Sequence, residues 1–208
     1  RAEVVSMDAK HPDKEAIKRA GQILQNGGLV AFPTETVYGL GGNALDPRAS
    51  MKIYAAKGRP SDNPLIIHIA DMSSLPKIVS EIPAKAQLLA EKFWPGPLTI
   101  ILKRTDKIPP CVSAGLDTVA VRMPLDTTAR DIIAASVPLA APSANTSGRP
   151  SPTSAECVIG DLDGKIDAVV MGKDCAVGVE STVITLVTDP PKILRPGAVT
   201  PEQLKTVI

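Results

Sequence analysis

The sequence predicts an α/β fold, leaning towards α+β, in which helices flank a twisted mixed β-sheet. Short apolar runs bounded by Gly and Pro are typical of buried strands, and they alternate with segments whose apolar residues recur at helical spacing. Between residues 181 and 195 two strands follow each other without a helix, which indicates a mixed rather than a purely parallel sheet. No linker or repeat divides the chain, so we expect a single domain over residues 1–208.

The first quarter of the chain is predicted to form a helix, a strand and a second helix. Residues 13–25 place apolar side chains on one helix face, and the glycine pair at 27–28 ends that helix. The apolar run at 29–32 indicates a short buried strand. Asp46 has the position of an N-cap, and Pro47 follows at the first helical position of a helix that runs to about residue 56.

Residues 33–42 are first polar and then rich in glycine. Within and just after them, Gly39, Gly41 and Ala44 match the spacing of a dinucleotide-binding fingerprint. That fingerprint needs glycines that open a helix directly after a strand, whereas Asp46 starts the next helix several residues later. The match is therefore weak evidence for a dinucleotide site, and the sequence contains no GxxxxGK[ST] phosphate-binding loop.

The centre of the chain is predicted to form a strand at 65–69, helices at 72–79 and 83–93, and strands at 98–102 and 118–122. His68 interrupts a continuous apolar run, either as a core histidine bonded to a backbone carbonyl or as a ligand contact. Trp94 opens a Pro-Gly-Pro turn that is either a packing corner or a pocket wall. Arg122 ends a strand, where it is either a surface charge or a bidentate partner for a carboxylate.

The last part of the chain is predicted to form helices at 127–136 and 153–161, strands at 138–141 and 168–170, and strands that begin at 181 and 193. A capping box from Thr200 to Gln203, with Pro201 at the first helical position, starts a final helix. The loop at 142–151 is rich in hydroxyls and amides and leaves the end of a strand. Ligand sites of α/β sheets lie at such strand ends, although ordinary loops are polar too.

Composition excludes several classes of protein. The 208 residues carry a formal net charge of +1 and 44% hydrophobic residues, an ordinary globular profile without the overall basicity of a nucleic-acid-binding protein. No apolar run reaches the roughly 18 residues of a membrane span, and the N-terminus does not resemble a signal peptide. The three cysteines are widely spaced and form no CxxC pair, which favours a reducing, cytoplasmic location and gives no structural zinc motif.

The stretch from Lys57 to His68, KGRPSDNPLIIH, combines two cations with polar side chains and leads into a buried strand. A loop of this kind can hold an anionic ligand, and a solvated surface turn explains it equally well. Similar side chains stand at other predicted strand ends; the full set is Thr36, Lys57, Arg59, Asn63, His68, Arg122, Ser143, Asn145, Ser181 and Arg195. Hydroxyls and cations with few carboxylates favour a site that holds a polyanion and positions a second small molecule, rather than hydrolysis by an activated side chain.

Seven short motifs follow one another from about residue 15 to 200. They are PTETVYGL at 33–40, KGRP at 57–60, NPL at 63–65, WPGP at 94–97, SAN at 143–145, GVEST at 178–182 and RPG at 195–197. Together these motifs resemble the YrdC family, the threonylcarbamoyl-AMP synthases. The resemblance implies a twisted sheet around a deep cationic cleft and the reaction of L-threonine, bicarbonate and ATP to threonylcarbamoyl-AMP, pyrophosphate and water. It also implies partner enzymes that transfer the threonylcarbamoyl group to a tRNA adenosine.

The resemblance also implies roles for single residues. The nucleotide contacts are Lys57, Arg59, Asn63, Thr118, Ser143, Asn145, Ser151 and Arg195. The L-threonine contacts are Thr36, His68, Arg122, Ser181 and the backbone at Ala141. Lys57 and Arg59 are the catalytic candidates, because a fixed cation stabilises charge that develops on phosphate oxygens. Mg²⁺ is expected to accompany ATP, while no carboxylate cluster in the sequence marks a metal held by the protein.

Two other functions remain open at this point. An RNA-binding module would use the cationic cleft for a phosphate backbone, although the net charge of +1 argues against this as the main function and leaves weak tRNA binding possible. A carbamoyl-transfer domain of a larger maturation enzyme would carry fused modules, and none is visible in this sequence. A longer synthase with an additional C-terminal domain is also compatible with the motifs. No membrane partner is expected.

Overall fold

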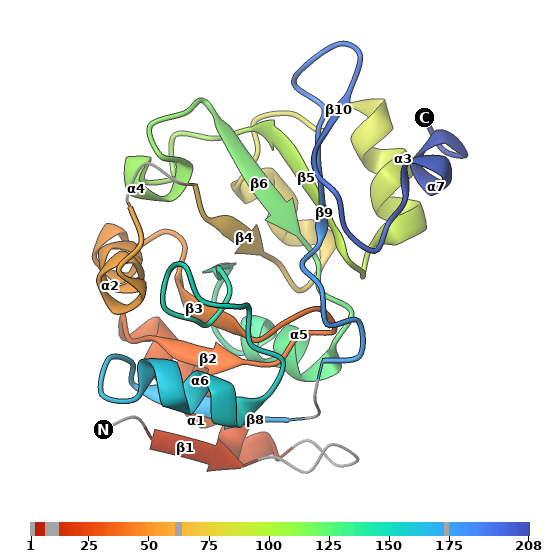
Figure 1. The fold of residues 1–208 in the computed structure, drawn as a ribbon. Helices are drawn as coiled ribbons and strands as arrows, with labels where there is room; N and C mark the ends of the chain where they lie inside the picture. The colour runs from red at the N-terminus through yellow and green to blue at the C-terminus, as the bar shows by residue number, and fades with distance from the viewer. Residues whose placement is uncertain (1–2, 7–12, 61–63, 173–174) are drawn as a thin grey trace.

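The computed structural model describes residues 3–6, 13–60, 64–172 and 175–208 (Figure 1). Within these ranges the strands are β1 (Glu3–Ser6), β2 (Val30–Phe32), β3 (Gly39–Asn43), β4 (Ile66–His68), β5 (Leu98–Lys103), β6 (Thr118–Arg122), β7 (Leu139–Ala140), β8 (Ala168–Met171), β9 (Thr182–Thr185) and β10 (Lys192–Arg195). The helices are α1 (Lys14–Gln25), α2 (Pro47–Lys57), the 3₁₀ helix η1 (Met72–Lys77), α3 (Ala84–Phe93), α4 (Pro110–Ser113), α5 (Thr127–Ala134), α6 (Ala155–Leu162) and α7 (Pro201–Lys205).

The ten described strands form one sheet in the order β1-β8-β2-β3-β7-β4-β6-β5-β9-β10. The pairs β1/β8, β2/β8, β4/β6 and β5/β9 are parallel. The pairs β2/β3, β3/β7, β4/β7, β5/β6 and β9/β10 are antiparallel. The predicted mixed sheet with flanking helices is therefore confirmed.

Around β2 and β8 the sheet is buried on both faces. Val30 and Phe32 of β2 pack in one apolar cluster with α1 and α5, whereas Ala31 between them packs in another cluster with α6. This separation follows from the two-residue period of a strand, which sends successive side chains to opposite faces. Figure 1 shows α6 in front of this part of the sheet. The short, wholly apolar runs of β2 and β8 reflect that double burial.

The middle strands β4, β5 and β6 have an apolar core on one face only. Ile67 of β4 and Val119 and Val121 of β6 belong to the core cluster that contains residues of α2, α3 and α4. Their neighbours Ile66, His68, Ala120 and Arg122 instead line a cavity. The same alternation therefore assigns every second residue of these strands to the core and the others to a candidate site.

Three elements were not predicted, namely β1, β3 and α4. β3 lies in the glycine-rich stretch to which we assigned no strand, because glycine lowers strand propensity. Close packing explains the glycine: a Cβ atom on Gly41 would lie 2.6 Å from Cε1 of Phe32 on the neighbouring strand β2. The glycines of the weak dinucleotide fingerprint thus lie in a strand and open no helix. The expected start of α2 is confirmed, since the Asp46 side chain caps it by accepting from the Arg48 N–H at 2.9 Å.

The turn after α3 is a packing corner that also supports the cavity. Trp94 is buried, and its Nε1 donates a hydrogen bond to the Leu98 carbonyl at 2.7 Å. The carbonyl of Gly96 in the same turn accepts from Nε of Arg122 at 3.1 Å. The interpretation as a packing corner therefore holds, whereas no residue of the turn lines the cavity itself and the turn acts on it through Arg122. Among the described helices, none has the length and apolar character needed to cross a bilayer.

Candidate active site

A cavity of about 380 Å³ opens on the face of the sheet opposite the core of the middle strands. Its size lies within the range of small-molecule sites, which is roughly 300–1,000 Å³. Eight residues that the sequence predicted for the site line it: Thr36, Arg59, His68, Arg122, Ala141, Ser143, Ser181 and Arg195. These residues come from positions far apart in the chain, so the fold brings the two predicted contact sets into one place.

The remaining predicted residues lie beside the cavity or outside the described ranges. Lys57 and Asn145 are buried next to the lining residue Ser143, and Ser151 contacts the lining residue Glu180. Thr118 begins β6 on the same face as the lining residues Ala120 and Arg122, towards the other end of the strand. Asn63 falls outside the described residues. The roles of all these residues stay predictions.

Arg122 is the most firmly held cation of the site. It is buried, and its guanidinium forms an ion pair with Glu35 through Nη2. Nη1 donates to Oγ1 of Thr36 at 2.9 Å, and Nε donates to the Gly96 carbonyl. Burial lowers the pKa of Arg122, and the charge and hydrogen bond of Glu35 oppose that shift. An arginine has five N–H groups, so two remain for an anion after the three bonds to described residues.

His68 ends β4 and is also buried. Burial lowers its pKa to about 3, and the positive charge of Arg122 adds to this effect, so the imidazole is neutral at physiological pH. Its Nδ1 lies 3.2 Å from the Ile66 carbonyl, which can only accept, so Nδ1 carries the proton. Nε2 is consequently a hydrogen-bond acceptor. The structure therefore contains both features foreseen for His68, a backbone partner and a place in the cavity.

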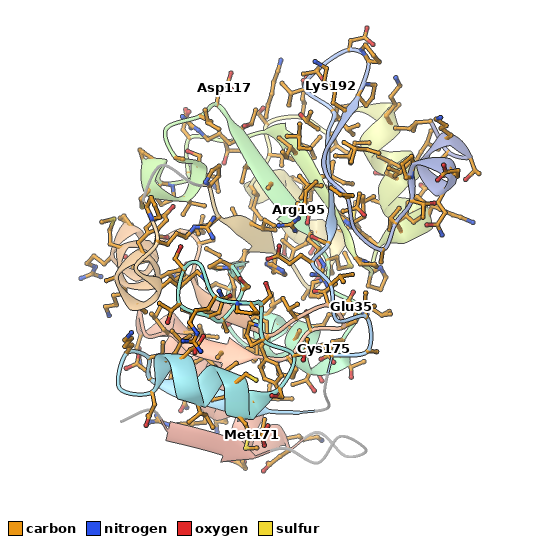
Figure 2. The ribbon with its side chains drawn as sticks, in the orientation of Figure 1. Glu35, Asp117, Met171, Cys175, Lys192 and Arg195 are labelled. Carbon is orange, nitrogen blue, oxygen red and sulfur yellow. The ribbon has the colours of Figure 1, made fainter. Side chains whose placement is uncertain are left out.

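Arg195, the last residue of β10, holds the residues just before β9 through hydrogen bonds at the cavity. Its Nε donates to the Ser181 carbonyl at 3.0 Å, and its Nη2 donates to Ser181 Oγ at 3.1 Å. Ser181 Oγ also shares a hydrogen bond of 2.7 Å with the hydroxyl of Thr99, which is fully buried on β5. The third nitrogen, Nη1, donates to Glu180 at 3.2 Å. In Figure 2 Arg195 lies near the centre of the view, above Glu35.

Lys57 has a different environment from the loop that we expected. It is the last residue of α2 and is buried, and Gly58 follows it as a left-handed C-cap with φ of 62°. Its Nζ donates to the carbonyls of Ser143 at 2.5 Å and Asn145 at 2.7 Å, and its own carbonyl accepts from the Ser147 N–H at 2.7 Å. The ammonium group thus clamps the loop that follows β7. Lys57 is therefore placed to hold that loop, which carries three predicted nucleotide contacts, Ser143, Asn145 and Ser151.

A pH dependence of stability follows from this clamp. Burial, assisted by the charge of Arg59, lowers the pKa of Lys57 from 10.5 to about 8. Between these values the unfolded chain binds more protons at this site than the folded chain does, so this group makes the folded state more stable as pH rises from 8 to 10.5. Urea unfolding of the wild type and of Lys57→Met between pH 7.5 and 10 should show the wild type gaining about 1–3 kcal/mol relative to the variant. Parallel pH profiles would contradict the shift.

The sequence reasoning missed several acidic and hydroxyl residues of the site. Thr34 and Glu35 lie in the motif at 33–40, and Glu180 lies in the motif at 178–182, yet none of the three was assigned a role. Thr99 lies in an apolar strand and gave no signal. The scarcity of carboxylates was itself the available signal: a glutamate among so many cations is expected to be paired with one of them.

The described residues contain no group of three or more His, Cys, Asp or Glu side chains that could hold a metal ion. Glu180 is the one carboxylate among the described residues of the lining, and it is engaged by Arg195. A hard cation such as Mg²⁺ takes about six oxygen ligands. The described lining therefore does not fit a magnesium site built by the protein alone.

Comparison with known proteins shows to which family the chain belongs. The Sua5, YciO and YrdC family model, described as telomere recombination, matches residues 22–197. The chain belongs to this family. A threonylcarbamoyl-AMP synthase of Pyrococcus abyssi is 53% identical over 193 residues, which cover 92% of this chain and 57% of that protein. One of Bacillus subtilis is 54% identical over 194 residues, which cover 92% of this chain and 56% of that protein.

A solved structure supports the same family assignment. The Pyrococcus abyssi Sua5 protein in complex with L-threonine is 50% identical and has a TM-score of 0.95, with 100% of this chain and 61% of that chain covered. The chain thus spans little more than half the length of these two curated synthases. The resemblance to the YrdC family inferred from seven motifs is confirmed.

Proposed function

We propose that this chain carries the catalytic domain of a threonylcarbamoyl-AMP synthase, which joins L-threonine, bicarbonate and ATP and releases pyrophosphate and water. One observation carries the proposal: Arg59, Arg122 and Arg195, from three separate segments, line a single cavity together with the hydroxyls of Thr36, Ser143 and Ser181. Such a cavity can bind two anionic reactants at once. The names of the close relatives support the same activity.

L-Threonine is assigned to the buried end of the cavity. The two remaining N–H groups of Arg122 suit its carboxylate. Thr34 Oγ1 donates to the Val37 carbonyl at 2.6 Å, so in its 2.9 Å contact with Thr36 the Thr36 hydroxyl is the donor. Thr36 Oγ1 and Nε2 of His68 are then both acceptors, which suits the ammonium group or the hydroxyl of the amino acid. A threonine-bound relative supports this end of the proposal.

The nucleotide is assigned to the side of Arg59 and Arg195, beside the loop that Lys57 clamps. In the proposed reaction the amine of threonine and bicarbonate form a carbamate and water. A carbamate oxygen then bonds to the α-phosphorus of ATP while the bond to the bridging oxygen breaks, and the electron pair leaves with pyrophosphate. Fixed cations stabilise the charge that develops on the phosphate oxygens, and one well-placed donor contributes roughly 3–4 kcal/mol in such sites. Holding the reactants together contributes about 7–11 kcal/mol at best.

Two parts of the proposal concern groups outside the chain. Because the described lining does not fit a magnesium site, Mg²⁺ is expected to arrive bound to the phosphates of ATP. The product is a mixed anhydride of a carbamate and AMP, so it must be consumed by an enzyme that transfers the threonylcarbamoyl group to a nucleophile. We assign that step to the partner enzymes that modify a tRNA adenosine.

The direct test is pyrophosphate release by the purified chain. With ATP, Mg²⁺, bicarbonate and L-threonine we expect pyrophosphate together with threonylcarbamoyl-AMP, detected by mass spectrometry. Omitting L-threonine or bicarbonate should abolish both signals, because the attacking carbamate then cannot form. Pyrophosphate release that does not depend on L-threonine would contradict the proposed activity. So would the lack of any product from a chain whose folding has been verified by circular dichroism.

A further inference from the structure

Glu180 has a position in the cavity that the proposed chemistry does not explain. It is the second of two glutamates that form ion pairs with arginines of the site. Each of its carboxylate oxygens has one partner: Oε2 accepts from Nη1 of Arg195 at 3.2 Å, and Oε1 accepts from Oγ of Ser151 at 3.4 Å. Arg195 and Ser151 are both predicted nucleotide contacts. A carboxylate thus occupies the place between two groups that are expected to receive an anionic or polar oxygen of the nucleotide.

The hydrogen bonds of Arg195 show how this carboxylate can be exchanged for another anion. Ser181 holds the guanidinium through Nε and Nη2, and these bonds do not involve Glu180. Only Nη1 points to Glu180. A rotation of the Glu180 side chain would therefore release Nη1 to a phosphate oxygen while the arginine itself stays in place. The exchange needs no change in the backbone of β10.

The exposure of the two ion pairs separates their roles. The side chains of Arg122 and Glu35 are 4% and 8% exposed, so breaking this pair would leave a buried charge without compensation. The side chains of Arg195 and Glu180 are 35% and 38% exposed, and pairs that are this exposed are weak because water screens them. The pair at Glu35 is thus a permanent part of the site, and the pair at Glu180 can dissociate.

The charge of Glu180 also reaches the other cations on the nucleotide side. Burial is the main influence on the pKa of both Lys57 and Arg59 and lowers it, while the negative charge of Glu180 acts in the opposite direction on both groups. Glu180 therefore stabilises the charged forms of these cations before a substrate provides negative charge of its own. The negative charge of a bound triphosphate would stabilise these cations in place of Glu180.

We propose that Glu180 is an internal competitor of the nucleotide: it occupies the anion position between Arg195 and Ser151, and ATP displaces it on binding. This inference rests on the proposed function, because it requires that Arg195 faces ATP. On this proposal Glu180 limits the affinity of the site for the nucleotide. Between turnovers its negative charge compensates the positive charges of the site. The residue would thereby favour the departure of the anionic products as well.

The test is the affinity for ATP of Glu180→Gln, measured by isothermal titration calorimetry with Mg²⁺ and without L-threonine, so that no turnover begins. The substitution keeps the shape of the side chain and removes its charge. We expect binding to become about threefold to fivefold tighter, the effect of removing one exposed ion pair from the unbound state. A gain in affinity is informative because structural damage would weaken binding. Glu81→Gln, which removes an exposed partner of Lys103 from another surface pair, should leave the affinity unchanged.

A double-mutant cycle separates competition for Arg195 from a general effect of charge. In the background of Arg195→Ala the change Glu180→Gln should no longer tighten ATP binding appreciably, because no guanidinium is left to compete for. Equal tightening in both backgrounds, or unchanged or weaker binding by Glu180→Gln alone, would overturn the inference while the proposed function stands. If the folded wild type binds no ATP at all, the proposed function fails and the inference fails with it.

Discussion

Replacement of Arg59 by alanine is expected to lower kcat by roughly 100- to 1,000-fold, the loss seen when one preorganised donor to a developing oxyanion is removed. Arg59 lines the cavity beside the loop clamped by Lys57, and its Nη2 donates to the Pro64 carbonyl at 2.7 Å. That bond orients the guanidinium between the C-cap of α2 and the segment that leads into β4. Pyrophosphate release with saturating substrates measures the effect directly.

Stability should change little in the same variant. Arg59 is only partly buried, and its side chain contributes a hydrogen bond worth about 1 kcal/mol, which for a chain of this size corresponds to a melting temperature shift of roughly 2–4 °C. Arg48→Ala is the matched control, because the Arg48 side chain is 88% exposed on α2 and lies outside the cavity lining. A large fall in the melting temperature of Arg59→Ala, with activity lost in proportion, would indicate a structural role for the residue instead.

Replacement of Glu35 by alanine is expected to destabilise the protein by about 3–5 kcal/mol, because it leaves the guanidinium of Arg122 buried without its counter-ion. The same change removes the acceptor of the Leu125 N–H, which donates to Oε2 of Glu35 at 3.0 Å. Urea unfolding at neutral pH measures the loss. This should be among the most destabilising single substitutions around the cavity, although the residue is not expected to react.

Glu180→Ala is the comparison for that experiment. It removes a carboxylate of the same type from another arginine of the same cavity, but from a pair that is more than one-third exposed. We therefore expect a loss of less than about 1 kcal/mol. Similar losses in the two variants would mean that burial does not distinguish the two ion pairs. In that case the contrast between a permanent and a displaceable pair would be wrong.

Much of the fold was predictable because its elements carry local signals. The capping box at Thr200, the N-cap at Asp46 and the apolar runs of β4 to β6 are short-range patterns, and the structure contains each of them. β3 could not be predicted, because its glycines indicate a turn when they are considered alone. Only the neighbouring Phe32 explains them, since its ring occupies the space that a side chain on Gly41 would need.

The sequence predicted which residues belong to the candidate site, but it did not predict their contacts. Eight predicted residues line one cavity, yet Lys57 turns out to be buried against two backbone carbonyls. A lysine at the end of a helix is usually exposed. Nothing near Lys57 in the sequence indicates its acceptors, which lie more than 80 residues away at Ser143 and Asn145. The same distance in sequence hides the pairing of Glu35 with Arg122, which are 87 positions apart.

The sequence by itself determined the family, the order of most of the helices and strands, and the residue types that surround the cavity. These properties depend on local pattern and on motifs, both of which can be read along the chain. The tertiary structure decided which side of each strand faces the cavity and which donors are already engaged by the protein. It also decided that Glu35 is buried while Glu180 is partly exposed. That difference arises from packing between distant segments, and because burial governs the strength of an ion pair, it separates two glutamates that look equivalent in the sequence.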